Sequence, residues 1–180
     1  MFTKPPISYM QEPQRFKVSS YRTWPATSED EGETVRISVG RVDQQTKQKY
    51  VFEKVLPQPS KLIVVTFSRP AGLVFSENSA STQVLVSEVV KGSQAGQKFR
   101  LAQFDKTRLQ ECAVPGDVLR AVTATAVVSV GKWAFGQRLE RHVVLFGADG
   151  QRWPKIAGAL KQGLAQDGSV TFVLERATPK

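Results

Sequence analysis

The spacing of apolar and polar positions along the chain predicts a protein built mainly from β-strands. Alternation at Val35, Ile37 and Val39 is typical of a half-buried strand, and a polar turn would join it to a second strand over residues 49–56. Short apolar runs, or alternation with polar residues, predict further strands. These lie over residues 62–67, 73–75, 84–90, 118–130, 142–146 and 169–176.

Helical spacing is clearest near the C-terminus. Residues 153–164 carry Pro154 in the first turn, which suits a helix start. One apolar face would be formed by Ile156, Ala157, Leu160 and Leu164. A shorter helix is expected to begin within residues 91–96, and a second helical stripe would be formed by Phe99, Leu101, Phe104 and Leu109. The expected fold class is therefore α+β, mainly β, with one long and one short helix.

The segment KLIVVTFSRPAGL (residues 61–73) combines a buried strand, a sharp break and the start of another strand. Such a loop can point consecutive backbone N–H groups into one concavity, which binds anions such as carboxylates. Gly72 would allow the backbone to turn and approach a ligand closely. Arg69 would add a positive charge beside it. The alternative is a turn with a purely structural role.

Residues 1–33 form a segment of a different kind, with prolines and no sustained period. We expect an extended arm here, followed by a β-hairpin over residues 34–57 and the main domain over residues 58–180. The arm carries aromatic residues, of which Phe16, Tyr21 and Trp24 are the expected anchors on a partner protein. The alternative is that the arm folds back over the hairpin of the same chain.

Charge adds a preference for anionic partners. The net charge is +9, and most of the excess lies in residues 58–180. The chain has no block of Lys/Arg and no aromatic-and-basic ribonucleoprotein signature, so a nucleic-acid partner is not expected. No apolar run approaches the roughly 18 residues of a membrane span, which leaves peripheral membrane association open.

The remaining composition argues against catalysis. With one cysteine, Cys112, and one histidine, His142, neither a disulfide framework nor a Cys/His zinc site can form within the chain. The sequence contains no nucleophile elbow, no phosphate-binding loop and no paired-carboxylate motif. We therefore expect a protein that is not an enzyme and needs no cofactor.

Taken in order, these segments resemble a PDZ domain over residues 61–176. The resemblance depends on the PAGLVF loop, the strand VLVSEVV, the turn and strand PGDVLRAV, and a late helix before the strand VTFVLER. It implies a PDZ-like, partly open β-barrel, preceded here by the arm and the hairpin. The version found here is most similar to PDZ domains of plant and algal plastid proteins. Two segments, 97–112 and 129–150, are longer than the family pattern and could cover the groove or add a contact surface.

The resemblance also implies a site. A peptide would add as a strand in a groove between the strand that starts at Leu73 and the late helix. Backbone N–H groups of residues 71–73 would receive its terminal carboxylate, and Trp153 would select the residue two before the end. The residues expected to bind peptide are Arg69, Ala71, Gly72, Leu73, Phe75, Trp153, Ala157 and Leu160.

Two functions follow as expectations. The first is a non-enzymatic adaptor or assembly factor that binds a peptide C-terminus or strand in a PDZ-type groove. The second is a structural or linker subunit of a large protein complex, of which a photosynthetic complex is one candidate, bound through the arm and the basic surface. The resemblance implies a plastid as the location. The N-terminus is basic, rich in hydroxyl groups and poor in acids, which is compatible with an organelle transit segment and equally with an arm of the mature protein. The alternative is the cytoplasm.

Overall fold

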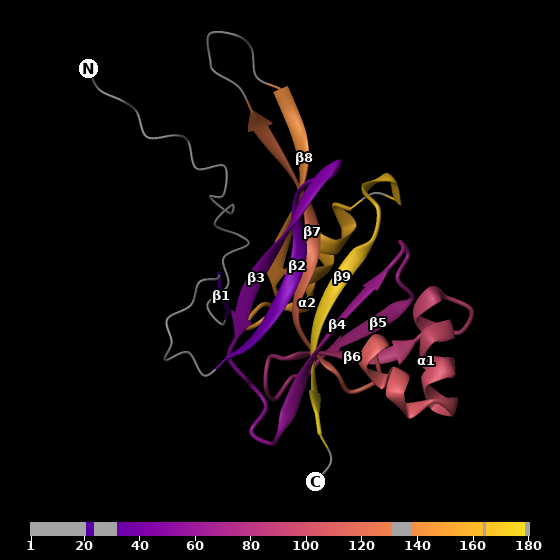
Figure 1. The fold of residues 1–180 in the computed structure, drawn as a ribbon. Helices are drawn as coiled ribbons and strands as arrows, with labels where there is room; N and C mark the ends of the chain where they lie inside the picture. Colours follow the sequence, from indigo (N-terminus) through magenta and orange to yellow (C-terminus); the bar gives the residue numbers. More distant parts are fainter. Residues whose placement is uncertain (1–20, 24–31, 131–137, 164, 179–180) are drawn as a thin grey trace.

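One curled sheet dominates the structure, a computed structural model that describes residues 21–23, 32–130, 138–163 and 165–178 (Figure 1). The strands are β1 (Tyr21–Thr23), β2 (Glu33–Arg41), β3 (Gln44–Phe52), β4 (Ser60–Phe67), β5 (Leu73–Glu77), β6 (Val84–Val89), β7 (Val118–Val130), β8 (Arg138–Gly147) and β9 (Val170–Ala177). The main path of the sheet runs β1-β3-β2-β8-β7-β6-β5, and β9 pairs with both β4 and β7. The expected mainly-β, α+β class is confirmed.

The relative lengths of the two helices are the reverse of those expected. Helix α1 (Gln94–Phe104) has 11 residues and α2 (Trp153–Lys161) has 9, so the late helix is the shorter one. Short 3-10 turns occupy Lys106–Glu111 and Ala165–Asp167. The late helix was expected to continue to residue 164, but α2 ends at Lys161. The N–H of the next residue, Gln162, bonds to the carbonyls of Ala159 and Leu160, which closes the helix.

The stripe expected over residues 99–109 faces the core only in part, since Phe99 packs against it. The buried residues of α1 are Ala95 and Ala102, whereas Leu101 and Phe104 are exposed. Small side chains on the inner face let α1 lie close to the protein body. Leu101 and Phe104 therefore belong to the outer surface, whereas Phe99 and Leu109 are half-buried.

The hairpin β2–β3 is joined to the main sheet. It turns at residues 42–43, earlier than expected, and its strands pair from Glu33↔Phe52 to Arg41↔Gln44. Beyond that, Gly40 and Arg41 pair with β8. Apolar residues from the hairpin and from the main sheet form one core cluster: Val35, Ile37, Val39, Tyr50, Phe52, Leu62, Ala121, Leu145 and Val173. The domain boundary at residue 57 stays a prediction, but side chains on both sides of it share a core.

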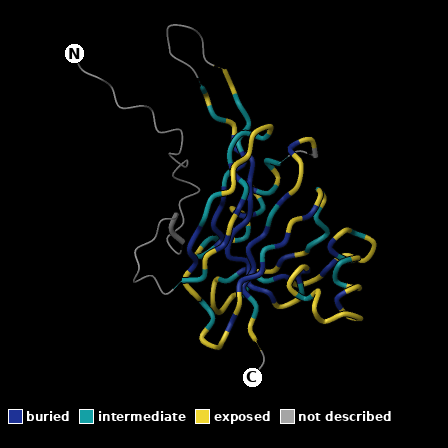
Figure 2. Tube along the Cα trace, viewed as in Figure 1, coloured by how far each residue is buried: buried dark blue, intermediate teal, exposed yellow. Residues whose placement is uncertain are grey.

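A larger core cluster lies on the other face of the central strands. It contains the phenylalanines Phe67, Phe75, Phe146 and Phe172, together with Ile156 and Ala159 of α2. Alternating positions of β4 and β9 point into the two clusters: Leu62 and Val173 toward the hairpin, Ile63 and Phe172 toward α2. Strands buried on both faces have nearly continuous apolar sequences, as the LIVV run of β4 does. Figure 2 shows this doubly buried centre.

A buried ion pair lies where the hairpin joins the main sheet. Arg120 occupies an irregularity in the β7–β9 register, and its guanidinium donates to the Glu175 carboxylate, to Asp149 and to the Glu53 carbonyl. Arg120 and Glu175 are both 0% exposed. A bulge redirects a side chain, and here it turns Arg120 into the protein.

The same carboxylate holds the segment that leads from the hairpin into β4. Glu175 accepts hydrogen bonds from the N–H groups of Val55 and Leu56 and from Ser60 Oγ at 2.6 Å. These partners satisfy the remaining lone pairs of a buried charge. The linker is therefore fixed to the sheet rather than only tethered to it.

Candidate functional site

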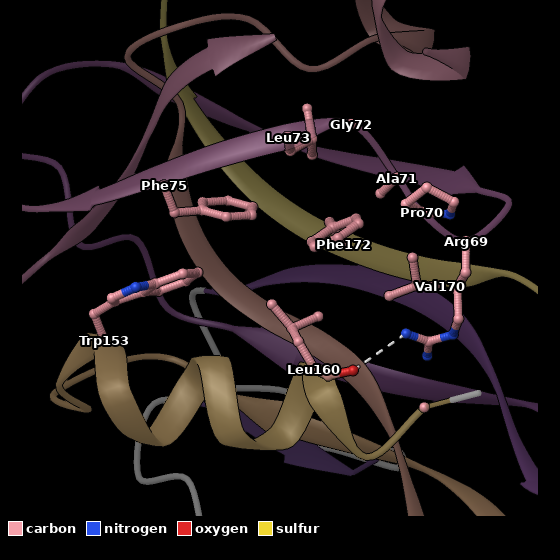
Figure 3. A pocket seen from close by; sticks show the side chains of 11 residues that line it. Arg69, Pro70, Ala71, Gly72, Leu73, Phe75, Trp153, Leu160, Val170 and Phe172 are labelled. Atoms are coloured by element: carbon pink, nitrogen blue, oxygen red, sulfur yellow. Dashed lines mark hydrogen bonds between the residues drawn. The ribbon is translucent and has the colours of Figure 1, made fainter. Parts of the chain in front are cut away.

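A hollow of about 500 Å³ lies between β5 and α2 (Figure 3). This volume falls in the range of ligand pockets, which are mostly apolar with a few placed polar groups. The lining residues come from the loop after β4, from β5, from α2 and its end, and from β9. They are Arg69, Pro70, Ala71, Gly72, Leu73, Phe75, Trp153, Leu160, Gly163, Val170 and Phe172.

The floor of the hollow is aromatic. The ring of Phe75 lies 5.4 Å from that of Trp153 and 5.7 Å from that of Phe172, measured between centroids. Tilted pairs at these distances are favourable and add rigidity beyond the area they bury. Phe75 and Phe172 belong to the main core, so the floor is fixed by the packing of the whole domain.

Strand β5 forms one wall and lies at the end of the main strand path. Among the described strands, it pairs only with β6, from Leu73↔Val89 to Glu77↔Val84. Its other edge faces the hollow and α2 (Figure 3). A strand edge of this kind can take up a further strand through main-chain hydrogen bonds.

The loop before β5 is held from behind by the start of α1. Gly72 has φ +77°, and its carbonyl accepts a hydrogen bond from the Val90 N–H at 2.9 Å. A Cβ at this position would lie 2.1 Å from Ser93 Cβ. The Ser68 N–H donates to Gln94 Oε1 at 2.6 Å. Glycine at position 72 is thus required both by the backbone conformation and by the close contact with Ser93.

Among the described residues, Arg69 is the only charged one that lines the hollow. Its guanidinium lies against Gly163, where an added Cβ would come within 2.3 Å of Arg69 Cζ. One long hydrogen bond, 3.5 Å, joins Nη1 to the Leu160 carbonyl, and the buried Nε has no hydrogen-bond partner among the described residues. The guanidinium is therefore fixed in place but poorly satisfied.

The surroundings weaken the charged form of Arg69. Desolvation lowers the pKa of the guanidinium from its usual value, and the charge of Asp167 only partly opposes this. Asp167 is itself held by Arg141, whose Nε and Nη2 donate to its two carboxylate oxygens at 2.7 and 2.5 Å. A half-buried cation with an unmet donor favours an anionic ligand.

The structure brings together seven of the eight residues expected to bind peptide. Arg69, Ala71, Gly72, Leu73, Phe75, Trp153 and Leu160 all line the hollow. Ala157 does not; it is half-buried, and the buried positions of α2 are Ile156 and Ala159. The apolar face of α2 is thus turned relative to the one expected from the sequence.

Sequence reasoning missed Pro70, Gly163, Val170 and Phe172 as lining residues. Val170 and Phe172 could have been noticed, because they alternate with polar neighbours in a strand expected after α2. The position of that strand beneath the hollow comes only from the pairing of β9 with β4 and β7. The long segments 97–112 and 129–150 contribute no lining residue among their described parts.

The arm is described only at β1. Tyr21–Thr23 pairs antiparallel with β3, with Tyr21 opposite Phe52, although no strand was expected in the arm. This pairing favours the alternative in which the arm folds back on the hairpin of its own chain. Phe16 and Trp24 lie outside the described residues.

Other kinds of site receive no support. Within the described ranges, no group of three or more His, Cys, Asp or Glu side chains is placed to hold a metal ion. In the same ranges, no helix has the length and apolar character needed to cross a membrane. No protein-family model, curated protein or solved structure matches the chain. Functional inference therefore depends on the geometry of the hollow.

Proposed function

We propose that this protein is a non-enzymatic adaptor that binds the C-terminal end of a partner protein in the groove between β5 and α2, in the manner of a PDZ domain. The partner chain adds along the free edge of β5. Its last side chain enters the hollow over Phe75, Phe172 and Leu160. Its terminal carboxylate lies at the loop of residues 69–73.

The observation that carries the proposal is the state of Arg69. Its guanidinium is fixed against Gly163, is partly desolvated and has a buried Nε without a partner. A carboxylate would supply the missing acceptor and would add to the counter-charge that Asp167 provides only in part. Hydrogen bonds between charged groups contribute about 1.5–3 kcal/mol, roughly tenfold or more in affinity.

The apolar part of the groove supports a peptide rather than a small anion. An anion alone would need only the loop, yet the hollow continues past Leu73 to the Phe75–Trp153 pair (Figure 3). Alternate side chains of an added strand point to the same side. A ligand with a terminal apolar residue and a second side chain near Trp153 would fill this length. The plastid location stays a prediction.

The test uses the full chain and a library of short peptides with free C-terminal carboxylates, compared with the same library amidated at the C-terminus. We expect binding of peptides that end in an apolar residue, and a loss of about tenfold or more on amidation. Fluorescence polarisation measures both. Equal binding of the two libraries would exclude carboxylate recognition by this groove.

Two variants assign the effect to Arg69. Gly163→Ala should displace the guanidinium without changing the charge of the protein, and Arg69→Gln removes the charge. Both should weaken binding of the free-carboxylate peptides and leave the amidated ones unaffected. Arg152→Gln is the matched control, since Arg152 is exposed and does not line the hollow.

Leu73→Asp should abolish binding by placing a like charge beside the peptide carboxylate. Gly72→Val is not a clean test of the groove. It would combine an unfavourable backbone conformation with a clash against Ser93, and so would disturb the start of α1. Thermal unfolding of each variant, compared with the unmodified chain, separates loss of binding from loss of structure.

A further inference from the structure

Helix α1 carries large apolar side chains on its outer face. Leu101 is 48% exposed and Phe104 is 86% exposed, and Val90, just before the helix, is 40% exposed. Residues 97, 100, 101 and 104 fall on one side of a helix because they are three or four positions apart. Figure 1 places α1 at the margin of the molecule, away from the β7–β8 hairpin, and Figure 2 shows its outer surface largely exposed.

Cationic side chains are present on α1 and in the turn before it. Lys91 and Arg100 line a second hollow of about 440 Å³, together with Val89, Gly92, Gly96, Gln97, Phe99 and Gln103. No acidic residue lines it, and α1 itself contains none. Among the described residues, no carboxylate forms an ion pair with Lys91 or Arg100; the nearby Asp105 instead binds Thr107 and Arg108.

We propose that the outer face of α1 binds the surface of an anionic phospholipid membrane. Leu101 and Phe104 would enter the boundary between headgroups and acyl chains, and Lys91 and Arg100 would contact the phosphate groups. Exposed apolar residues with cationic side chains close to them in the chain are suited to this interface, where long basic side chains reach the headgroups while apolar ones are buried.

Charge and shape favour a membrane over an acidic protein as the occupant. The most exposed apolar residue, Phe104, is at the last position of the helix, followed by the exposed residues 105–108. It stands out from the surface instead of lining the second hollow. A protein partner would need a pocket to receive it, whereas a bilayer accepts a protruding ring without one. The lipid surface is also distinct from the peptide groove, so this inference does not depend on the proposed function.

The test is sedimentation of the full chain with vesicles of phosphatidylcholine alone or of phosphatidylcholine mixed with phosphatidylserine. We expect binding to the mixed vesicles, little binding to the neutral ones, and weakening as salt is raised. The double variant Leu101→Gln/Phe104→Gln should lower the partition coefficient by about tenfold or more. Lys91→Gln and Arg100→Gln should each lower it by roughly fivefold.

Matched controls are available elsewhere on the surface. Leu139→Gln removes an apolar residue of β8 whose exposed fraction, 71%, lies between those of Leu101 and Phe104, and Lys155→Gln removes an exposed cation from α2. Leu139→Gln should leave vesicle binding unchanged, and Lys155→Gln should lower it by no more than about twofold. All variants should retain the unfolding temperature of the unmodified chain, because the altered side chains are exposed.

Three results would overturn the proposal. One is an absence of binding to the mixed vesicles. A second is binding that the α1 variants and the controls reduce equally, since that would indicate general charge attraction. The third is retention of the chain by an RNA homopolymer or by an acidic polypeptide, with Lys91 and Arg100 required, but not by vesicles.

Discussion

The central strands β4, β7, β8 and β9 bury two faces in different ways. The face toward α2 is lined by aromatic rings, among them Phe67, Phe146 and Phe172, and it leaves a hollow of about 500 Å³ at its margin. The face toward the hairpin is lined by smaller side chains, such as Ala121 and Val173, which the hairpin covers. Neither of the two hollows described above is lined by a residue of that second face.

This difference indicates which face of the sheet contributes to stability alone and which also binds a ligand. Small side chains on the hairpin face allow Tyr50 and Phe52 to pack closely against the sheet and close it. Rigid rings on the other face pack against one another at an angle and leave room beside α2. The hairpin face is therefore expected to carry stability alone, and the groove face to carry both stability and ligand binding.

The largest effect should follow removal of the hairpin. A chain of residues 58–180 would expose Leu62, Leu145 and Val173, each at most 6% exposed in the whole protein. Uncovering three such residues would cost roughly 5 kcal/mol or more, comparable with the whole stability of a small domain. We expect the shortened chain to unfold without a cooperative transition when urea unfolding is monitored by circular dichroism.

A pair of point variants isolates the same effect in the full chain. Ile37 is 1% exposed at the centre of β2, and its neighbour Arg36 points to solvent. Ile37→Asn should reproduce much of the loss, while Arg36→Asn should leave the urea midpoint nearly unchanged. If residues 58–180 unfolded at the same urea concentration as the full chain, the hairpin would not be needed to stabilise that face of the sheet.

The buried ion pair should have the next largest effect. Arg120→Met leaves the Glu175 carboxylate buried without its cation, and breaking one partner of such a pair costs about 3–5 kcal/mol. The hairpin linker should loosen as well, because Glu175 binds the N–H groups of Val55 and Leu56. Urea unfolding measures the free energy, and faster hydrogen exchange at residues 53–60 would report the linker.

The pH dependence gives an independent check on Glu175. Burial alone would raise the pKa of this carboxyl, but hydrogen bonds from Ser60, Leu56 and Val55 and the charge of Arg120 hold it below its ordinary 4.5. A carboxyl with a lowered folded-state pKa contributes stability that is fully present above its unfolded pKa and is lost as pH falls through the folded value. Glu175→Gln should therefore be less stable at neutral pH and lose less stability below pH 4.5. Parallel acid unfolding curves for the two proteins would contradict this.

The local pattern of the sequence predicted most strands but not what covers them. Alternation at Val35, Ile37 and Val39 indicated one buried face of a hairpin. The local sequence could not predict that Leu62, Leu145 and Val173 would pack beneath it. Contacts of this kind join positions far apart in the chain. Helix α1 was misjudged for a related reason: its fully buried positions are alanines, and two large residues of the stripe, Leu101 and Phe104, face outward.

The site was predictable where chemistry is local. The loop of residues 69–73 was recognised from its proline, glycine and arginine, and it does line the hollow. Phe172 and Gly163 were missed because their roles depend on which strand lies under the groove and where α2 ends. The sequence could not show that Arg69 lies against Gly163, since that contact exists only after α2 has packed against the sheet.

The smallest effects come from two adjacent residues of β9 that point to opposite faces. Val173 belongs to the hairpin cluster, whereas Phe172 lines the groove and contacts Phe75. Val173→Ala and Phe172→Leu should each lower the free energy of unfolding by about 1–2 kcal/mol, since each removes part of a buried side chain. Only Phe172→Leu should also weaken peptide binding, because it alone changes the floor of the hollow. Urea unfolding and fluorescence polarisation on the same preparations measure the two quantities. If Val173→Ala weakened peptide binding as much as Phe172→Leu does, the two faces would be coupled through the strand, and the division of stability from binding would fail.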